Sequence, residues 1–212
     1  MIAGWSTPSR RTILIVVGVV AVVALVAVGG WLWYGAQERR AATAYAEATM
    51  RLALAADPKA SAEAKTAAAA ALEDVVTRYP SASGGAKAAL DLGNLRYESR
   101  QWAAARGAYE IAAARGRSRT VTTLARSGVG HTWESERDHA KAADAYQALA
   151  RDLGPKDFLF EDTLLDLARA QEQAGRKADA AETYRRLLKD VPSSRRAADI
   201  RARLATLNVS AK

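Results

Sequence analysis

Residues 92–113 read LGNLRYESRQWAAARGAYEIAA, and the same pattern recurs as VGHTWESERDHAKAADAYQALA at 129–150 and LARAQEQAGRKADAAETYRRLL at 167–188. Equivalent positions are 37 and then 38 residues apart. Each copy holds a small residue, then an alanine, then a tyrosine. These sets are Gly93, Gly130 and Ala168; Ala105, Ala142 and Ala180; and Tyr109, Tyr146 and Tyr184. Self-similarity at such a period indicates a chain of stacked structural units.

The order of residue types within one copy predicts a pair of packed helices. Two helices that cross closely need small residues at the crossing, and Gly93 opposite Ala105 would supply them. Tyr109, one turn further along the second helix, would fill the gap towards the next copy. Each helical pair leaves an apolar face that only a neighbouring pair covers, so the copies are expected to stack into a solenoid.

These residues resemble the tetratricopeptide repeat, a helix–turn–helix unit of about 34 residues. Leu92, Gly93, Ala105 and Tyr109 match its pattern, and so does Pro192 at the end of the last copy. The first-helix aromatic departs from the pattern in all three copies: it is shifted to Tyr97, is Trp133 in the second copy and is replaced by Gln171 in the third. The extra residues of the longer period are expected in the turns near 116–120 and 154–157, where Gly and Pro cluster.

Weaker units flank the three copies. Ala68, Leu72, Val75 and Pro80 repeat the spacing seen at the end of the third copy, and Ser194 can cap a final helix. The sequence therefore predicts an all-α fold of about three to four helical hairpins. The expected segments are a divergent hairpin at 37–80, repeats at 86–119, 123–156 and 161–194, and a capping helix at 195–208.

A transmembrane helix is expected at 12–34. No charged side chain occurs from residue 12 to residue 37, and a helix over 12–34 would be about 34 Å long, enough to cross a hydrocarbon core of about 30 Å. Trp31, Trp33 and Tyr34 cluster at one end, where such rings prefer the headgroup layer. Arginine pairs lie at both ends, at 10–11 and 39–40. The number of positive charges is therefore nearly equal on the two sides, and the positive-inside rule does not decide the orientation.

We expect an uncleaved anchor with residues 1–11 as a cytoplasmic tail and the C-terminal domain in the periplasm. The apolar core is longer than the h-region of a signal peptide, which spans about 7–15 residues. An exported form whose N-terminal signal is cleaved is the alternative.

Catalytic, metal and cofactor chemistry finds little support. The chain has no cysteine, and its two histidines, His131 and His139, are expected on different helices of one hairpin. A two-histidine metal site on a helix needs a spacing of four residues. We therefore expect no enzyme, no cofactor and no metal.

The net charge of +8 does not by itself indicate nucleic-acid binding. Lys and Arg are interleaved with Asp and Glu in the soluble part, for example from Glu182 to Asp190, and no stripe of basic and aromatic residues stands out. We expect no nucleic-acid partner.

Protein partners are expected in the groove that tetratricopeptide repeats form with the first helix of each hairpin. The candidate groove residues are Asn94, Tyr97, His131, Glu134, Arg169 and Glu172. Tyr97 would act as an apolar anchor, and Arg169 would bind a carboxylate or phosphate. The alternative is that these six are solvated polar residues without a ligand.

An N-terminal anchor followed by a short, Ala-rich solenoid resembles the YfgM family of ancillary translocon subunits. That resemblance implies a bacterial inner-membrane protein whose periplasmic domain works beside the SecYEG translocon with periplasmic chaperones or client polypeptides. The repeat style is also similar to BamD and to the cell-division coordinator CpoB. BamD-like proteins carry a lipid on an N-terminal cysteine, which is lacking here, and CpoB-like proteins are exported with a cleaved signal. A self-associating structural role is the rival to the adaptor role.

Overall fold

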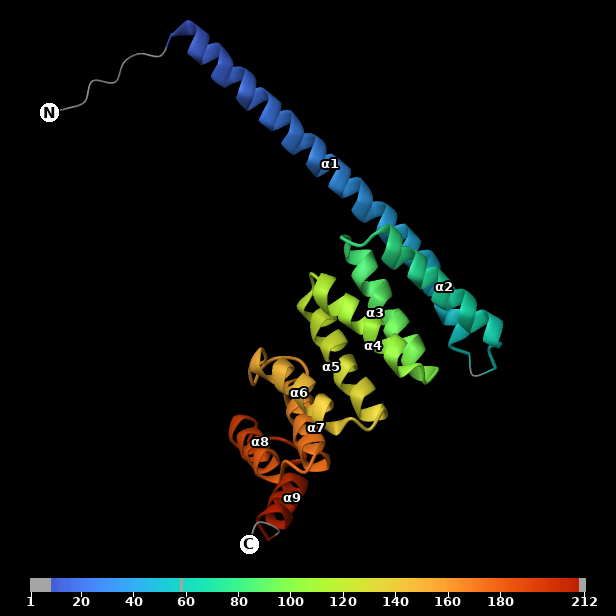
Figure 1. Ribbon diagram of the computed structural model, residues 1–212, viewed down its shortest axis with the longest axis vertical. Helices are drawn as coiled ribbons and strands as arrows, with labels where there is room; N and C mark the ends of the chain where they lie inside the picture. The colour runs from blue at the N-terminus through green and yellow to red at the C-terminus, as the bar shows by residue number, and fades with distance from the viewer. Residues whose placement is uncertain (1–8, 58, 210–212) are drawn as a thin grey trace, which may run out of the picture. The chain divides into compact units, whose positions relative to one another are not determined.

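The computed structural model describes residues 9–57 and 59–209, apart from the side chains of 12, 13, 208 and 209. The described residues form helices and no strand, which confirms the all-α prediction (Figure 1). The helices are α1 Arg10–Ala55, α2 Ala62–Arg78, α3 Ser83–Glu98, α4 Trp102–Arg115, α5 Arg119–Ser135, α6 His139–Arg151, α7 Phe160–Gln173, α8 Lys177–Asp190 and α9 Ala197–Val209. The chain divides into two compact units, residues 1–40 and 41–212.

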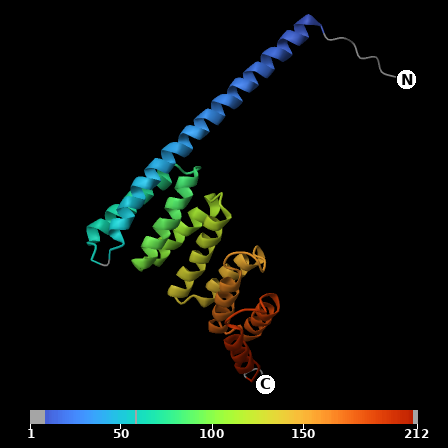
Figure 2. The ribbon, with the colours of Figure 1, turned by 180° about the vertical axis from the view of Figure 1, so that it is seen from behind.

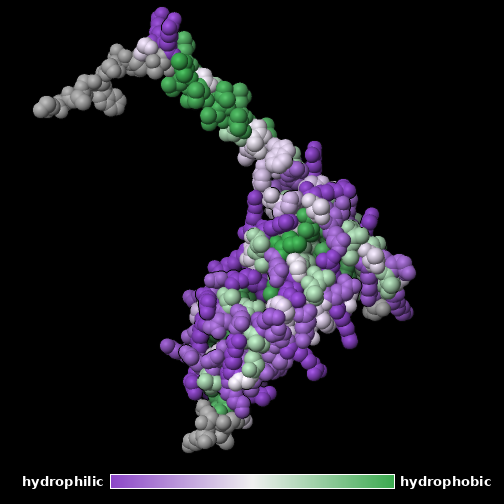
Figure 3. Space-filling view, viewed as in Figure 1, coloured by the Kyte–Doolittle hydropathy of each residue, from purple (hydrophilic) through white to green (hydrophobic). Residues whose placement is uncertain are grey.

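The first unit is dominated by the apolar part of α1. The described large apolar side chains there are exposed; Leu14 and Trp31, for example, are 71% and 73% exposed (Figure 3). By length and composition this helix is able to cross a membrane, a property that membrane spans share with N-terminal signal sequences. Most of the predicted cytoplasmic tail, residues 1–8, lies outside the described residues.

Helix α1 continues without interruption past the predicted membrane segment to Ala55. The predicted membrane segment, 12–34, and the predicted first hairpin, 37–80, are separate in the sequence-based prediction. No residue between them ends the helix. The intervening residues include one glycine, Gly35, and no proline, and a single glycine costs a helix only about 1 kcal/mol. The helix ends at Ala55, two residues before Asp57, and Pro58 lies outside the described residues.

The second unit consists of helical hairpins that follow one another along the chain, with α9 after the last (Figure 2). Most of its buried apolar side chains form two clusters, one from Ala48 to Ala125 and one from Ala142 to Leu207. The repeat alanines Ala105, Ala142 and Ala180 are all fully buried. The predicted turn 154–157 lies in the loop between α6 and α7. Of the predicted turn 116–120, residues 116–118 form the loop between α4 and α5, and Arg119 and Thr120 already belong to α5.

In the hairpins α3–α4 and α5–α6, the tyrosine, rather than the alanine, lies closest to the small residue of the first helix. A Cβ atom on Gly93 would lie 2.5 Å from Cδ1 of Tyr109, and one on Gly128 in α5 would lie 2.7 Å from the same ring. The sequence paired Gly93 with Ala105 instead. The reason is that helical side chains lean towards the N-terminus of their helix, so the Tyr109 ring covers the turn before its own Cα. One ring thus packs between two glycines of successive repeats.

The turn inside each hairpin has the same backbone geometry three times. Arg100, Arg137 and Gly175 occupy equivalent repeat positions and have φ values of 58°, 61° and 77°. In the first turn, the amide of Gln101 donates to the Arg96 carbonyl and the amide of Arg100 donates to the Tyr97 carbonyl, each at 2.9 Å. These two bonds define a Schellman motif, which ends a helix with one left-handed residue. The repeat pattern did not predict this turn geometry.

Side chains cap the N-termini of α2 and α6, and another side chain caps the turn before α9. Ser61 accepts a hydrogen bond from the Ala64 amide in α2, and Asp138 accepts one from the Lys141 amide in α6. Ser194 accepts from the Arg196 amide at 3.0 Å, and α9 then begins at Ala197, slightly later than the sequence predicted. Caps of this kind satisfy amides that have no partner within the helix.

Candidate partner-binding site

The hydroxyl groups of the three repeat tyrosines meet the candidate groove residues. Four of the six candidates, Asn94, His131, Glu134 and Glu172, contact such a hydroxyl. Tyr109 Oη donates to Asn94 Oδ1 at 2.8 Å, Tyr146 Oη donates to Glu134 Oε2 at 2.8 Å and lies 2.7 Å from His131 Nδ1, and Tyr184 Oη donates to Glu172 Oε1 at 2.6 Å. Each ring therefore crosses its hairpin and ends at the face that carries the candidates.

Tyr97, the predicted apolar anchor, is half-buried between hairpins. Its ring packs on Trp102 with the ring centroids 4.9 Å apart. Its hydroxyl shares a hydrogen bond of 2.9 Å with Ser135 Oγ, which links α3 to α5. Much of this side chain is thus engaged within the solenoid.

His131 stands where α5, α6 and α7 meet. Its Nδ1 faces the Tyr146 hydroxyl, while its Nε2 lies 3.3 Å from Ser127 Oγ and 3.9 Å from Asp166 Oδ2. Asp166 in turn forms an ion pair with Arg169, one turn later on α7. The structure therefore brings three of the candidates, His131, Glu134 and Arg169, into one network with two residues that the sequence did not single out.

Burial and charge act in opposite directions on the two carboxylates of this network. Burial raises the pKa of Asp166, and the charges of His131 and Arg169 offset that rise only in part. Burial also acts to raise the pKa of Glu134, but hydrogen bonds from His131 and Tyr146, with the charge of Arg169, bring that pKa below its usual value. Burial first, and then the negative charge of Glu134, raises the pKa of the Tyr146 hydroxyl.

A pocket of about 490 Å³ opens beside this network. It is lined by Ser127, His131, Leu159, Asp162, Leu165, Asp166, Arg169 and Arg196. Arg196 Nη1 pairs with Asp162 Oδ1 at 2.7 Å, and Leu159 has a left-handed backbone with φ 65°. Of the six candidates, only His131 and Arg169 line this pocket. Its surface combines leucine side chains with two partly exposed guanidinium groups, which suits a polypeptide segment that has both apolar and charged side chains.

Asp166 is the main residue of this network that was not among the six candidates. In the repeat alignment it takes the place of Gly128, and Asp91 takes that place in the first repeat. Asp91 is also a partly buried carboxylate, and it accepts a hydrogen bond of 2.7 Å from the Tyr45 hydroxyl on α1. Burial raises the pKa of Asp91 as well. A carboxylate at a position that faces the neighbouring helix was therefore a signal present in the sequence.

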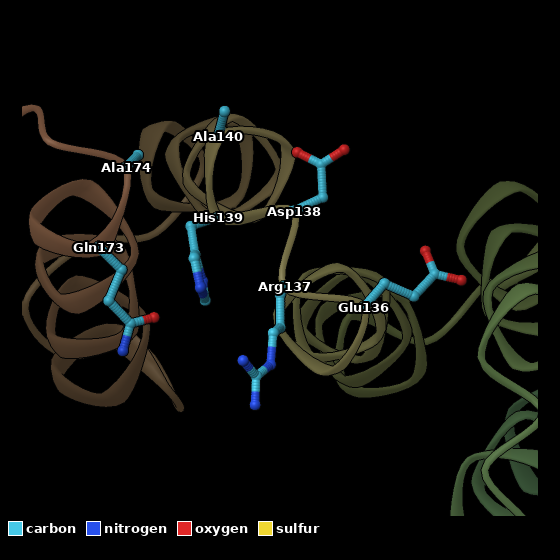
Figure 4. Close-up of a pocket in the computed structure, with 7 residues that line it drawn as sticks. All are labelled: Glu136, Arg137, Asp138, His139, Ala140, Gln173 and Ala174. Carbon is cyan, nitrogen blue, oxygen red and sulfur yellow. The ribbon is translucent and has the colours of Figure 1, made fainter.

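A second pocket, of about 460 Å³, lies at the turn between α5 and α6. Figure 4 shows the side chains of Arg137, His139 and Gln173 around the same space. His139 is the first residue of α6 and His131 lies on α5, as the sequence predicted. Within residues 9–57 and 59–209, no group of three or more His, Asp or Glu side chains is placed to hold a metal ion.

The fold and the repeated tyrosine contacts define an α-helical repeat protein of the protein-interaction class. The profile described as tetratricopeptide repeat-like domain matches residues 9–142, and the profile described as tetratricopeptide repeat matches residues 162–194. The chain belongs to the tetratricopeptide repeat-like domain family. No curated protein matches it.

Proposed function

We propose that this protein is a scaffold of the bacterial inner membrane, tethered by α1, that binds other proteins through the groove of its repeats. The observation that supports this proposal is the continuity of α1. One helix begins in an apolar stretch that is able to cross a membrane and ends among the packed helices of the repeat domain. Confinement beside a membrane raises the effective concentration of a weak partner without adding contacts.

The groove supports a partner role because its polar groups are already held in place. Tyr146, Glu134 and Asp166 fix the positions of His131 and Arg169, yet the Arg169 side chain stays 59% exposed. An arginine has several N–H donors, so pairing with Asp166 leaves donors for a ligand. Preorganised donors beside an apolar pocket lower the entropic cost of binding.

The finer proposal is an ancillary role at the Sec translocon, with periplasmic chaperones or client polypeptides as partners. It rests on the resemblance in layout to YfgM-like proteins, namely an apolar helix followed at once by Ala-rich hairpins. The match of the repeat-like profile begins at residue 9 and so covers both parts. In this proposal the repeat domain lies in the periplasm.

A self-associating structural protein, or a cell-division coordinator, is the second candidate. The exposed apolar side chains of Met50 and Leu54, at 71% and 73%, favour it, because they form a strip on the part of α1 beyond the predicted membrane segment. Such a strip is suited to contact with another helix.

Cysteine labelling tests the tether and its orientation, because the chain has no cysteine of its own. Full-length Lys177→Cys should react with a membrane-impermeant maleimide in cells with a permeabilised outer membrane, whereas Ser9→Cys should react only after lysis. Both variants should stay in the membrane at full mass after alkaline extraction. The reverse labelling pattern would overturn the periplasmic assignment, and a shortened soluble product would support the cleaved form.

A further inference from the structure

The positive charge of this protein is concentrated near its two ends. Residues 41–184 contain 19 Lys or Arg and 20 Asp or Glu, a net charge of −1. Residues 185–209 contain seven Lys or Arg and two Asp or Glu, a net charge of +5 in α8, the following turn and α9. The interleaving of charges inferred from the sequence therefore holds for the middle of the repeat domain but not for its C-terminal part.

Most of these C-terminal cations are not used by the fold. Arg186 pairs with Asp190 and Arg196 pairs with Asp162. In the described part of the chain, four others form no ion pair and are exposed. These are Lys189, Arg195, Arg201 and Arg203. Grouped like charges repel one another, so they cost folding free energy rather than supply it. Packing does not account for this cluster.

The cations surround α9 instead of lining one side of it. Ile200 and Leu207 form the buried side of the helix. Arg201 and Arg203 are two positions apart, about 200° around the helix axis, so they stand on opposite flanks of that buried side. A ligand that contacts both must bend around the end of the repeats.

We infer that the α8–α9 end is a docking surface for a flexible, acidic segment of a partner protein. Carboxylates match the forked donors of arginine, and a disordered segment is able to follow both flanks of α9. A flat anionic bilayer meets one flank only, and α8 and α9 have no exposed large apolar side chain among the described ones for insertion. Single-stranded nucleic acid needs exposed rings, whereas the one aromatic residue of 177–209, Tyr184, is 2% exposed. The four unpaired cations of this surface do not line the pocket beside His131, although Arg196 does.

The test uses the full chain in neutral detergent micelles and a fluorescent peptide made only of Glu and Ser. Its counterpart of Gln and Ser is the peptide control. The test variant is Arg195→Gln/Arg201→Gln/Arg203→Gln. The matched control is Arg51→Gln/Lys59→Gln/Lys65→Gln, which removes the same charge from exposed positions of the N-terminal hairpin.

We expect the Glu/Ser peptide to bind the wild type and to dissociate as salt is added. The test variant should weaken binding by about tenfold or more, and the matched control by less than about twofold. Equal weakening by both variants would overturn the inference, since only net charge would then matter. So would absence of binding at low salt, or stronger and equally Arg-dependent binding of phosphatidylglycerol vesicles or of an oligonucleotide.

Discussion

Gly130 and Tyr146 lie so close that a Cβ atom on Gly130 would be 2.3 Å from Cε1 of the Tyr146 ring. Gly130 belongs to the first helix of its hairpin and Tyr146 to the second. The ring cannot easily retreat, because its hydroxyl is held between Glu134 and His131. This contact fixes how closely α5 and α6 approach each other.

Gly130→Ala should therefore destabilise the protein by about 2–3 kcal/mol or more, since the new methyl group overlaps a fixed ring. Gly107→Ala is the matched control, because a Cβ there meets nothing within 4 Å. It should stabilise α4 by about 0.5–1 kcal/mol. Urea unfolding of the full chain in detergent, followed by circular dichroism, measures both. Equal effects of the two substitutions would contradict the contact.

The tyrosine hydroxyls should differ in what they contribute. Tyr146→Phe removes the 2.8 Å hydrogen bond to the Glu134 carboxylate, a charged acceptor, and should cost about 1.5–3 kcal/mol. Tyr109→Phe removes a bond to the neutral amide of Asn94 and should cost about 0.5–1.5 kcal/mol. The same unfolding measurement compares them, and a larger loss for Tyr109→Phe would refute the proposed order.

Substitutions at the left-handed turn residues Arg137 and Gly175 should change stability in opposite directions. Arg137→Gly should raise stability by about 0.5–1 kcal/mol, because a residue with a Cβ atom is strained at φ 61°. Gly175→Ala should lower it by about 1 kcal/mol for the same reason, although its Cβ would meet no neighbour. Thermal unfolding reports both shifts, and destabilisation by Arg137→Gly would show that the arginine side chain matters more than the backbone.

The carboxylates of Glu134 and Asp166 should affect the pH dependence of stability in opposite directions. The pKa of Glu134 is lowered in the folded state, so its contribution is present at neutral pH and is lost as the pH falls. The pKa of Asp166 is raised, so its contribution falls as the pH rises through the interval between its unfolded and folded values. Glu134→Gln should make the free energy of unfolding fall less steeply between about pH 7 and pH 3, and Asp166→Asn should make it fall more steeply. Identical slopes for both variants would exclude this assignment.

The repeated small and aromatic residues predicted the helical hairpins because helix packing depends on side-chain size at fixed spacing. The same pattern did not predict that Tyr109 would cover Gly93, since that contact depends on the lean of the side chain. The predicted segments 12–34 and 37–80 divide α1 at residues 35 and 36, although neither residue ends the helix.

The sequence pattern predicted only part of the candidate site. Position in the first helix identified His131, Glu134 and Arg169, because each repeat presents equivalent positions to the same face. Asp166, Leu165 and Arg196 come from a neighbouring turn of α7 and from the segment before α9. Their meeting depends on how the third hairpin and α9 pack, which no spacing within a single repeat encodes.

Photocrosslinking in intact membranes tests most directly whether the proposed groove of the repeat domain binds other proteins. A photoreactive residue would replace Arg169 or Asn94 in the groove, and Gln147 or Glu110 on exposed positions of α6 and α4 as controls. The account predicts that the groove positions capture a discrete partner, such as a translocon subunit, chaperone or client, and that the control positions do not. Capture of only a second copy of this chain, or the same products from all four positions, would contradict it.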